Sequence, residues 1–176
     1  MRKLLPLLLI ALFSVFIVSC NSDDNNNNNN NNTDTVAEVY EIKNENFTLN
    51  NRGNLTIYKQ FNNALYASDM VLIYRQEGET NGNPIWTLVP KSYYTTFGTV
   101  DYTYDFTIND VQIYLDTNIT DTETLNSYMN NQTFRVVVIP ATLGRSASNI
   151  STNSEYEDYN YVVRRYNINQ QNVKQL

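Results

Sequence analysis

Residues 101–108 read Asp-Tyr-Thr-Tyr-Asp-Phe-Thr-Ile, and this stretch decides the fold. Successive side chains of a β-strand point to opposite faces. The aromatic and apolar side chains of the stretch therefore share one face, and the polar side chains share the other. The first set is Tyr102, Tyr104, Phe106 and Ile108, and the second is Asp101, Thr103, Asp105 and Thr107. This alternation predicts a β-strand.

The apolar residues change parity immediately after this strand, because they now fall on Val111, Ile113 and Leu115. A single flat strand cannot move its apolar residues from one face to the other. Asn109-Asp110 is therefore expected to form either a tight hairpin turn or a β-bulge. Of the two, we favour the hairpin.

The β pattern continues along the chain from Val36. The chain has 14 tyrosines, β-branched residues are abundant and alanine is scarce, which is typical of strands. The pattern predicts strands at residues 37–42, 55–61, 69–76, 84–89, 100–108, 111–116, 133–140 and 160–168. Their short, regular spacing is typical of an antiparallel sandwich or barrel. We expect an all-β fold, an antiparallel β-sandwich (Ig-like or related) of about seven to nine strands.

Two segments, residues 70–74 and 134–139, are apolar on both faces and are expected to be the central strands. Residues 77–83, which include two glycines, predict the loop of a hairpin. Pro84 and Pro90 bracket the next strand and disfavour further pairing.

The remaining segments predict little regular structure. Residues 121–131 are compatible with one irregular helical turn. From Gly144 to Asn153 the chain is rich in serine and asparagine, which indicates a long loop before the last strand.

The N-terminus has the pattern of a lipoprotein signal peptide. Arg2 and Lys3 precede a 15-residue apolar run, 4–18, which matches the ~7–15 residues of a signal-peptide core and falls short of the ~18 expected of a spanning helix. Ile17-Val18-Ser19 leads directly into Cys20, the only cysteine. This pattern resembles the lipobox of bacterial lipoproteins.

The lipobox resemblance implies cleavage between Ser19 and Cys20, a diacylglyceryl thioether on Cys20, and acylation of the new amine. About two membrane signals give stable anchoring, so three acyl chains would attach the protein firmly to a bilayer. An ordinary cleaved signal with a chance cysteine is the alternative.

The residues after the cysteine predict a tether. Ser22-Asp23-Asp24 resembles the acidic export signal of surface lipoproteins of Bacteroidota; the alternative is a merely polar start of the tether. Residues 25–32 are eight consecutive asparagines, and a segment without apolar residues cannot offset its ordering entropy. We therefore predict a signal peptide at 1–19, a lipidated, disordered tether at 20–34 and a single β-sandwich domain at 35–176.

One further modification is suggested at the start of this domain. Asp34-Thr35-Val36 resembles the O-glycosylation acceptor of secreted Bacteroidota proteins, which would place a glycan on Thr35.

Composition argues against several classes of function. Removal of residues 1–19 takes Arg2 and Lys3 away and leaves ten basic and 18 acidic residues, a net charge of −8. Nucleic-acid binding needs clustered Lys and Arg, so nucleic acid is not expected as a partner. Histidine is absent, which removes a common general base and zinc ligand.

Motifs for catalysis and for cofactors are also missing. The sequence has no G-x-S-x-G and no phosphate-binding glycine loop. Four residues could gather oxygen ligands for Ca²⁺, but their spacing fails the EF-hand pattern, and we interpret them as a solvated turn: Asp116, Asn118, Asp121 and Glu123. We therefore expect no enzyme activity, no cofactor and no metal.

Aromatic residues at predicted strand ends and in loops are the remaining candidates for ligand contact. Flat rings of this kind could stack on sugars, and the candidates are Tyr93, Tyr94, Tyr156 and Tyr159. The alternative is that sheet proteins place tyrosine on half-buried faces. Trp86, between Ile85 and Leu88, is expected in the core.

Several segments resemble a family of small surface lipoproteins of Bacteroidota for which no activity is established: 69–75, 85–90, 104–107, 111–116 and 134–140. The resemblance implies an all-β domain and an outer-membrane location. We therefore expect an outer-membrane lipoprotein, anchored through Cys20 and facing the cell exterior, with a non-catalytic binding or structural domain. A glycan-binding module for polysaccharide uptake is the alternative, and a small hydrolase is less favoured.

Overall fold

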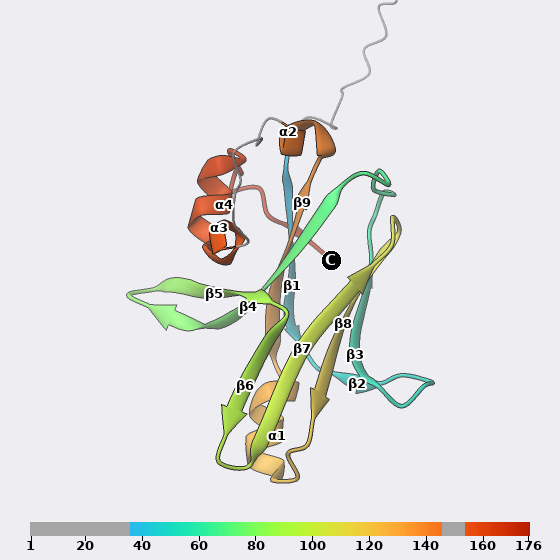
Figure 1. Ribbon diagram of the computed structural model, residues 1–176, viewed down its shortest axis with the longest axis vertical. Helices are drawn as coiled ribbons and strands as arrows, with labels where there is room; N and C mark the ends of the chain where they lie inside the picture. Colours follow the sequence, from blue (N-terminus) through green and yellow to red (C-terminus); the bar gives the residue numbers. More distant parts are fainter. Residues whose placement is uncertain (1–35, 146–153) are drawn as a thin grey trace, which may run out of the picture. The chain divides into compact units, whose positions relative to one another are not determined.

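The computed structural model describes residues 36–145 and 154–176, which form two packed five-stranded sheets (Figure 1). In spatial order, sheet A contains β10 (Lys174–Gln175), β1 (Glu38–Glu45), β9 (Gln132–Ile139), β4 (Met70–Thr80) and β5 (Asn83–Val89). Sheet B contains β2 (Thr48–Leu49), β3 (Leu55–Gln60), β8 (Asp110–Thr117), β7 (Gly98–Phe106) and β6 (Lys91–Thr95). All the pairings are antiparallel except β1 with β10. The predicted β-sandwich is confirmed.

The main core lies between the two sheets. It gathers the inward side chains of both sheets around contacts between the rings of Phe47, Tyr102 and Phe134, whose centroids are 5.7–6.1 Å apart. Such offset and edge-on pairs add to the gain from burial itself.

The predicted hairpin at Asn109-Asp110 is also confirmed. β7 pairs with β8 in antiparallel register, with Phe106 opposite Val111. Thr107 closes the turn, because its backbone N–H donates to the Asp110 carbonyl oxygen at 2.9 Å and its hydroxyl donates to the Asp110 carboxylate at 2.8 Å. The buried face of β7 ends before the turn: Tyr102 is fully buried, whereas Phe106 is 42% exposed.

β4 and β9 occupy the interior of sheet A, as their two apolar faces predict. Their inner faces join the main core. Their outer faces contribute Leu72, Tyr74 and Val137 to a second core, which α4 (Tyr159–Arg165) covers together with the chain after it. Figure 1 shows α3 (Ser154–Glu157) and α4 beside sheet A, away from β7 and β8.

The predicted strand at 160–168 is wrong, because residues 159–165 form α4. The buried residues Tyr159, Val162 and Tyr166 are three and four positions apart, which places them on one helix face. Asp158 caps the helix, since its carboxylate accepts from the Asn160 N–H at 2.9 Å. Strand-favouring tyrosine and valine are overruled here by packing against sheet A.

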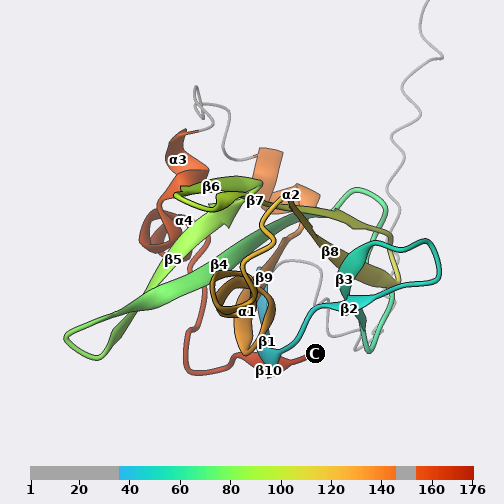
Figure 2. The ribbon, with the colours of Figure 1, turned by 90° about the horizontal axis from the view of Figure 1, so that it is seen from below.

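The predicted loop at 77–83 is much shorter than expected. β4 continues to Thr80, which pairs with Asn83, so only Asn81-Gly82 forms the turn. Both residues have positive φ, 53° and 75°, as a two-residue hairpin of the Asn-Gly type requires. The β4–β5 hairpin and the turn between β2 and β3 project on opposite sides in Figure 2.

Proline limits β5 as predicted, but it does not end the sheet structure. Pro84 pairs with Glu79 in β5, which is an edge strand where a missing N–H is tolerated. Pro90 is the one residue between β5 and β6, and there the chain passes from sheet A to sheet B. The sequence pattern missed β6, β2 and β10.

The predicted helical turn within 121–131 is a full helix, α1 (Thr122–Met129). α2 (Ala141–Arg145) precedes residues 146–153, which lie outside the described residues together with 1–35. The predicted signal peptide, tether, Cys20, Ser19, Ser22-Asp23-Asp24 and Thr35 thus lie outside the described part of the chain. Within residues 36–145 and 154–176, no helix is long and apolar enough to cross a bilayer.

Candidate functional site

The four tyrosines proposed for ligand contact lie in two separate regions. Tyr93 and Tyr94 belong to β6 in sheet B, whereas Tyr156 and Tyr159 pack on the outer face of sheet A. Tyr159 is 3% exposed, Tyr93 and Tyr156 are half-buried, and Tyr94 is 83% exposed. The fold therefore does not bring the four together as one aromatic surface.

Tyr93 belongs to a buried cluster around Arg75. The Arg75 guanidinium carbon lies 4.9–5.7 Å from the ring centroids of Tyr93, Tyr102 and Tyr128. Its Nε donates to the Gln132 side-chain oxygen at 2.9 Å, and its Nη1 lies 3.2 Å from Glu77. Because the rings come from β6, β7 and α1, this cluster fastens sheet B and α1 to β4.

Burial and a hydrogen bond to Glu77 keep Tyr93 in its neutral form. Tyr93 donates its hydroxyl proton to Glu77. Burial, together with that bond, raises the pKa of Tyr93 well above its ordinary value. A neutral phenol that serves as a donor is a structural part and not a base.

Tyr159 belongs to a second arginine cluster, on the outer face of sheet A. Arg135 Nη1 donates to the Tyr159 hydroxyl at 2.6 Å and to the Gln170 side-chain oxygen at 3.2 Å. The guanidinium carbon lies 4.5 Å from the ring centroid of Trp86, which is half-buried against this second core. These contacts attach α4 and the C-terminal segment to the sheet.

The acidic loop considered for Ca²⁺ does not gather its oxygens. Asp121 caps α1 by accepting from the Thr124 N–H at 2.9 Å, and the hydrogen bonding to Thr124 lowers the pKa of Asp121. The Asn118 side-chain oxygen accepts from the Thr99 N–H at 2.7 Å. Across the ranges that the structure describes, no three His, Cys, Asp or Glu side chains gather closely enough to hold a metal ion.

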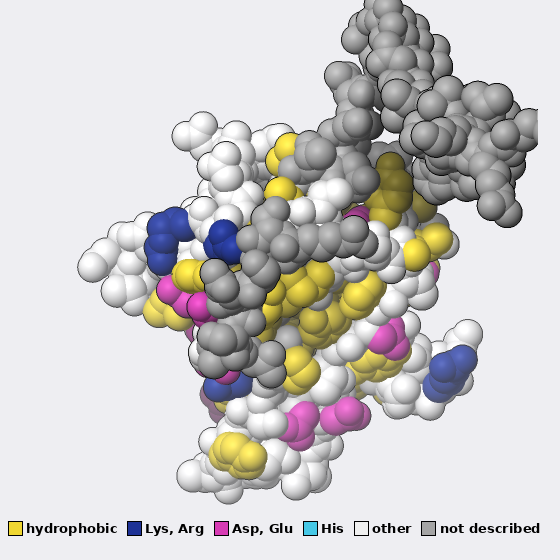
Figure 3. All heavy atoms as spheres, turned by 45° about the horizontal axis from the view of Figure 1, so that its top comes forward, with side chains coloured by type: hydrophobic (Ala, Val, Ile, Leu, Met, Phe, Trp, Pro, Cys, Tyr) yellow, Lys and Arg dark blue, Asp and Glu magenta, His cyan; other side chains and the backbone are white. Residues whose placement is uncertain are grey.

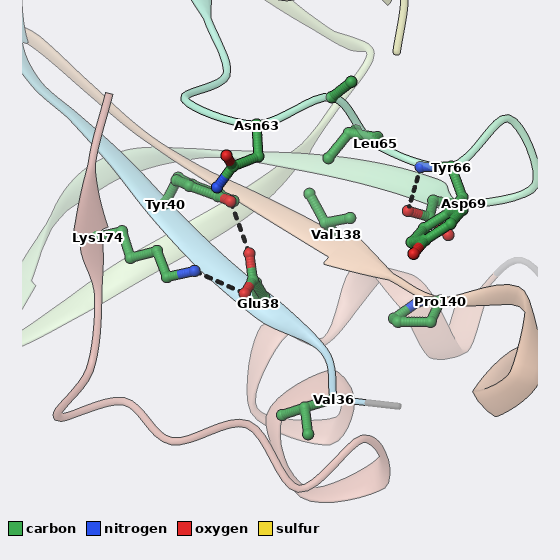
Figure 4. A pocket seen from close by; sticks show the side chains of 11 residues that line it. Val36, Glu38, Tyr40, Asn63, Leu65, Tyr66, Asp69, Val138, Pro140 and Lys174 are labelled. Carbon is green, nitrogen blue, oxygen red and sulfur yellow. Dashed lines mark hydrogen bonds and ion pairs between the residues drawn. The ribbon is translucent and has the colours of Figure 1, made fainter. Parts of the chain in front are cut away.

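A small pocket of about 160 Å³ lies beside β1, between β10 and the segment before β4. Figure 4 shows Val138 and Leu65 facing one another across it, with Tyr66 and Asp69 on one side and Lys174 on the other. The Lys174 ammonium bonds Glu38 at 2.6 Å, and the Tyr40 hydroxyl donates to the same carboxylate at 2.6 Å. Two charged groups of the pocket, Lys174 and Glu38, are thus already paired with one another, and the Asp69 carboxylate accepts from the Tyr66 N–H at 3.0 Å.

A larger, more open groove of about 340 Å³ lies on the outer face of sheet B. We name it the sheet B groove, and its lining residues are Asn50, Asn51, Arg52, Asn54, Thr56, Tyr58, Gln112 and Tyr114. They come from the turn between β2 and β3 and from the outward positions of β3 and β8. Each of these side chains carries a polar group, and the two tyrosines add aromatic rings.

Hydrogen bonds to Asn50 stabilise the turn that forms one wall of the groove. The Asn50 side-chain oxygen accepts from the N–H groups of Arg52 and Asn54 at 2.9 and 3.0 Å, and its carbonyl accepts from the Gly53 N–H at 2.9 Å. Gly53 has φ of 80°, a conformation that glycine adopts without strain. The amide side chains at the rim therefore stand on a closed turn.

Two tyrosines of the groove are held by aspartates on neighbouring strands. The Tyr58 hydroxyl donates to Asp110 at 3.1 Å, and the Tyr114 hydroxyl donates to Asp105 at 2.7 Å. The bond to Asp105 raises the pKa of Tyr114 above its ordinary value. Sequence reasoning missed both tyrosines, although their parity opposite to Ile57 and Ile113 marked them as outward-facing.

Basic side chains do not form one patch on the face shown in Figure 3. They lie there at several separate places, with acidic side chains between some of them, while hydrophobic side chains gather across the middle of the view. This distribution gives a phosphate backbone no continuous basic surface on that face.

Comparison of the chain with protein-family models, with curated proteins and with solved structures finds no match. The mostly-β sandwich, with its sheet B groove, is therefore the basis on which a function can be proposed.

Proposed function

We propose that this chain is an outer-membrane lipoprotein that presents a non-catalytic binding domain at the cell surface. The observation that carries the binding role is the contrast between the two outer sheet faces. α4 and the chain after it cover the outer face of sheet A. On the outer face of sheet B, by contrast, the side chains of Tyr58, Gln60 and Thr103 are exposed. The outer face of sheet B therefore keeps an open groove with lining residues that hydrogen bonds hold in place, and such a groove is available to a ligand.

The location rests on the N-terminal sequence. The apolar run of residues 4–18 and the sole cysteine at its end support lipidation of Cys20. Ser22-Asp23-Asp24 supports export to the exterior. The likeness to small surface lipoproteins of Bacteroidota agrees with both.

The absence of catalysis is supported by the chemistry of the available groups. The whole sequence lacks histidine, and its one cysteine is assigned to lipid. Three carboxylates are engaged as partners of other side chains: Glu77 with Arg75, Glu41 with Arg135, and Asp105 with Tyr114. Bound in this way, they orient other side chains.

Protease treatment of intact cells tests the location. External protease should degrade the wild-type domain. The Asp23→Ala/Asp24→Ala variant should stay in the membrane fraction yet become protected, and Cys20→Ala should leave that fraction. Protection of the wild-type domain would contradict surface display, and membrane retention of Cys20→Ala would contradict the lipid anchor.

Glycan binding in the service of polysaccharide uptake is the second candidate function. The observation that favours it is the lining of the sheet B groove by amides and tyrosines. An adjacent gene for an outer-membrane transporter, expressed together with this one, would support a role in uptake; constitutive expression without such a neighbour would count against it.

A further inference from the structure

From the sheet B groove we infer a binding site for a short, uncharged oligosaccharide. This inference rests on the binding role proposed above and names the ligand class and the residues that contact it.

The polar groups of the groove match sugar hydroxyls. The Asn51, Asn54 and Gln112 amides each offer both a donor and an acceptor. A sugar hydroxyl also donates and accepts, so one amide can bond two neighbouring hydroxyls of a ring. The amides stand at the rim and the floor of one groove, within reach of a single ligand.

The tyrosines supply the apolar contact that a sugar ring needs. Tyr58 lies opposite Gln112 in the β3–β8 pairing, and its hydroxyl reaches Asp110, two residues before Gln112 in β8. Tyr114 lies opposite Thr103, and its hydroxyl reaches Asp105, two residues further along β7. Both side chains therefore extend along the sheet toward the β7–β8 turn. The C–H groups of a sugar ring can pack against the electron-rich faces of such rings.

The two aspartates keep the tyrosines in place before a ligand arrives. Tyr58 is 49% exposed, and water could satisfy its hydroxyl as well as Asp110 does. The hydrogen bond is thus not required for solvation, and its effect is to orient the ring. An ordered surface loses less conformational entropy on binding than a mobile one.

The charges around the groove select against acidic ligands. Asp101 and Asp116 face each other across β7 and β8, and Asp105 and Asp110 lie on the same outward face by strand parity. These four carboxylates flank the groove, and Arg52 is the one charged side chain among its own lining residues. A uronic acid or a phosphate would meet like charge over most of the surface.

A protein partner fits this face less well than a sugar. The centre of a protein–protein interface is typically apolar. The outward residues of the three strands around the groove are all polar or tyrosine: Thr56, Tyr58, Gln60, Asp101, Thr103, Asp105, Asp110, Gln112, Tyr114 and Asp116. Hydroxyl-rich ligands match this surface better.

Calorimetric titration of the full chain in detergent tests the inference, with maltohexaose, cellohexaose, xylohexaose and mannohexaose as neutral probes and hexagalacturonate as the charged one. At least one neutral probe should bind more tightly than hexagalacturonate. Tyr58→Ala/Tyr114→Ala should weaken that binding by about tenfold or more, which corresponds to about 1.4 kcal/mol.

Two matched variants distinguish the contribution of the tyrosine rings from that of their hydrogen bonds to aspartate, and from the effect of removing any exposed tyrosine. Tyr58→Phe/Tyr114→Phe keeps the rings and loses the bonds to aspartate, so its affinity should lie between wild type and the alanine variant. Tyr94→Ala removes an exposed tyrosine from the edge strand β6 and should leave binding unchanged. Circular dichroism of each variant confirms that the sheets are intact.

Three results would overturn the inference: no binding of any neutral probe, stronger binding of hexagalacturonate, or neutral binding that survives Tyr58→Ala/Tyr114→Ala. The third would leave the proposed binding role standing and remove only the groove. Release of shorter sugars from a probe would instead contradict the non-catalytic role, whichever residues bind.

Discussion

The two outer sheet faces use the same residue type for opposite purposes. On sheet A, Tyr74 is fully buried, and its hydroxyl donates to the Tyr156 carbonyl at 2.7 Å. On sheet B, the exposed or half-buried Tyr58 and Tyr114 donate to carboxylates. A buried hydroxyl must have a partner, whereas an exposed one can use water. The partner therefore stabilises the fold on one face and orients a surface on the other.

This comparison also explains why the tyrosine content alone was ambiguous. Tyr102 and Tyr104, in the core between the sheets, donate to the backbone carbonyls of Tyr128 and Val71. Their burial raises the pKa of both. Tyr40, which is buried in the same core, nevertheless donates to the Glu38 carboxylate. Burial by residues distant in sequence, and not the kind of hydroxyl partner, therefore separates the tyrosines of the cores from those of the groove.

The largest expected loss of stability comes from a charge placed in the outer face of sheet A that α4 covers. Val137 is fully buried in β9, so Val137→Asp places an unpaired charge in the second core and should cost about 3–5 kcal/mol of the free energy of unfolding. Thr48→Asp, at an exposed position of β2, should change it by less than about 1 kcal/mol. Urea unfolding followed by circular dichroism measures both, and equal losses would contradict the covered face.

The next effect removes the contact between α4 and sheet A. Tyr159→Ala leaves a cavity beside Tyr74 and takes a partner from Arg135, so we expect a loss of about 3–5 kcal/mol. Tyr94→Ala, at an 83% exposed position, should be close to neutral. Amide hydrogen exchange should show faster exchange of residues 159–165 in the first variant only; unchanged exchange would mean that Tyr159 does not hold the helix.

A smaller effect concerns the start of α4. Asp158 accepts from the Asn160 N–H, and loss of a helix cap costs about 1 kcal/mol. Asp158→Ala should therefore lower the thermal midpoint, while Asp158→Asn keeps an acceptor and should lower it less. If the two variants melt together, the cap does not contribute.

The smallest expected effect concerns the pH dependence of a tyrosine on the exposed outer face of sheet B. The pKa of Tyr114 is raised by the bond to Asp105, so the folded state holds the phenol proton more tightly than the unfolded state does. The stabilisation is fully present below the unfolded value of about 10 and is lost as pH rises through the folded pKa.

Asp105→Asn should bring the pKa of Tyr114 back toward that value. An NMR titration of the Tyr114 ring, with Tyr94 as an internal reference, measures the change. An unchanged Tyr114 titration in the variant would show that Asp105 does not hold the ring.

The sequence by itself determined the features that depend on local pattern. The alternation in 101–108 and the parity change at Asn109-Asp110 predicted β7, β8 and their turn, because side-chain direction in a strand is a local property. The two-faced apolar segments predicted the interior strands β4 and β9. The lipobox-like pattern at Cys20 stays a prediction from the sequence, since residues 1–35 lie outside the described structure.

Only the tertiary structure decided what depends on distant partners. Residues 159–165 carry strand-favouring side chains and still form a helix, because Tyr159 and Val162 bury one helix face on sheet A. β6 needed β7 as its partner, since a short polar strand has no strong local signal. The sheet B groove arises where the Asn50 turn and β3 meet β8, whose groove residues Gln112 and Tyr114 come more than 50 residues later in the sequence. The local side-chain pattern predicts most of the strands. Packing between elements decides whether a segment with a weak local pattern becomes a helix or a strand, and it brings the residues of a site together.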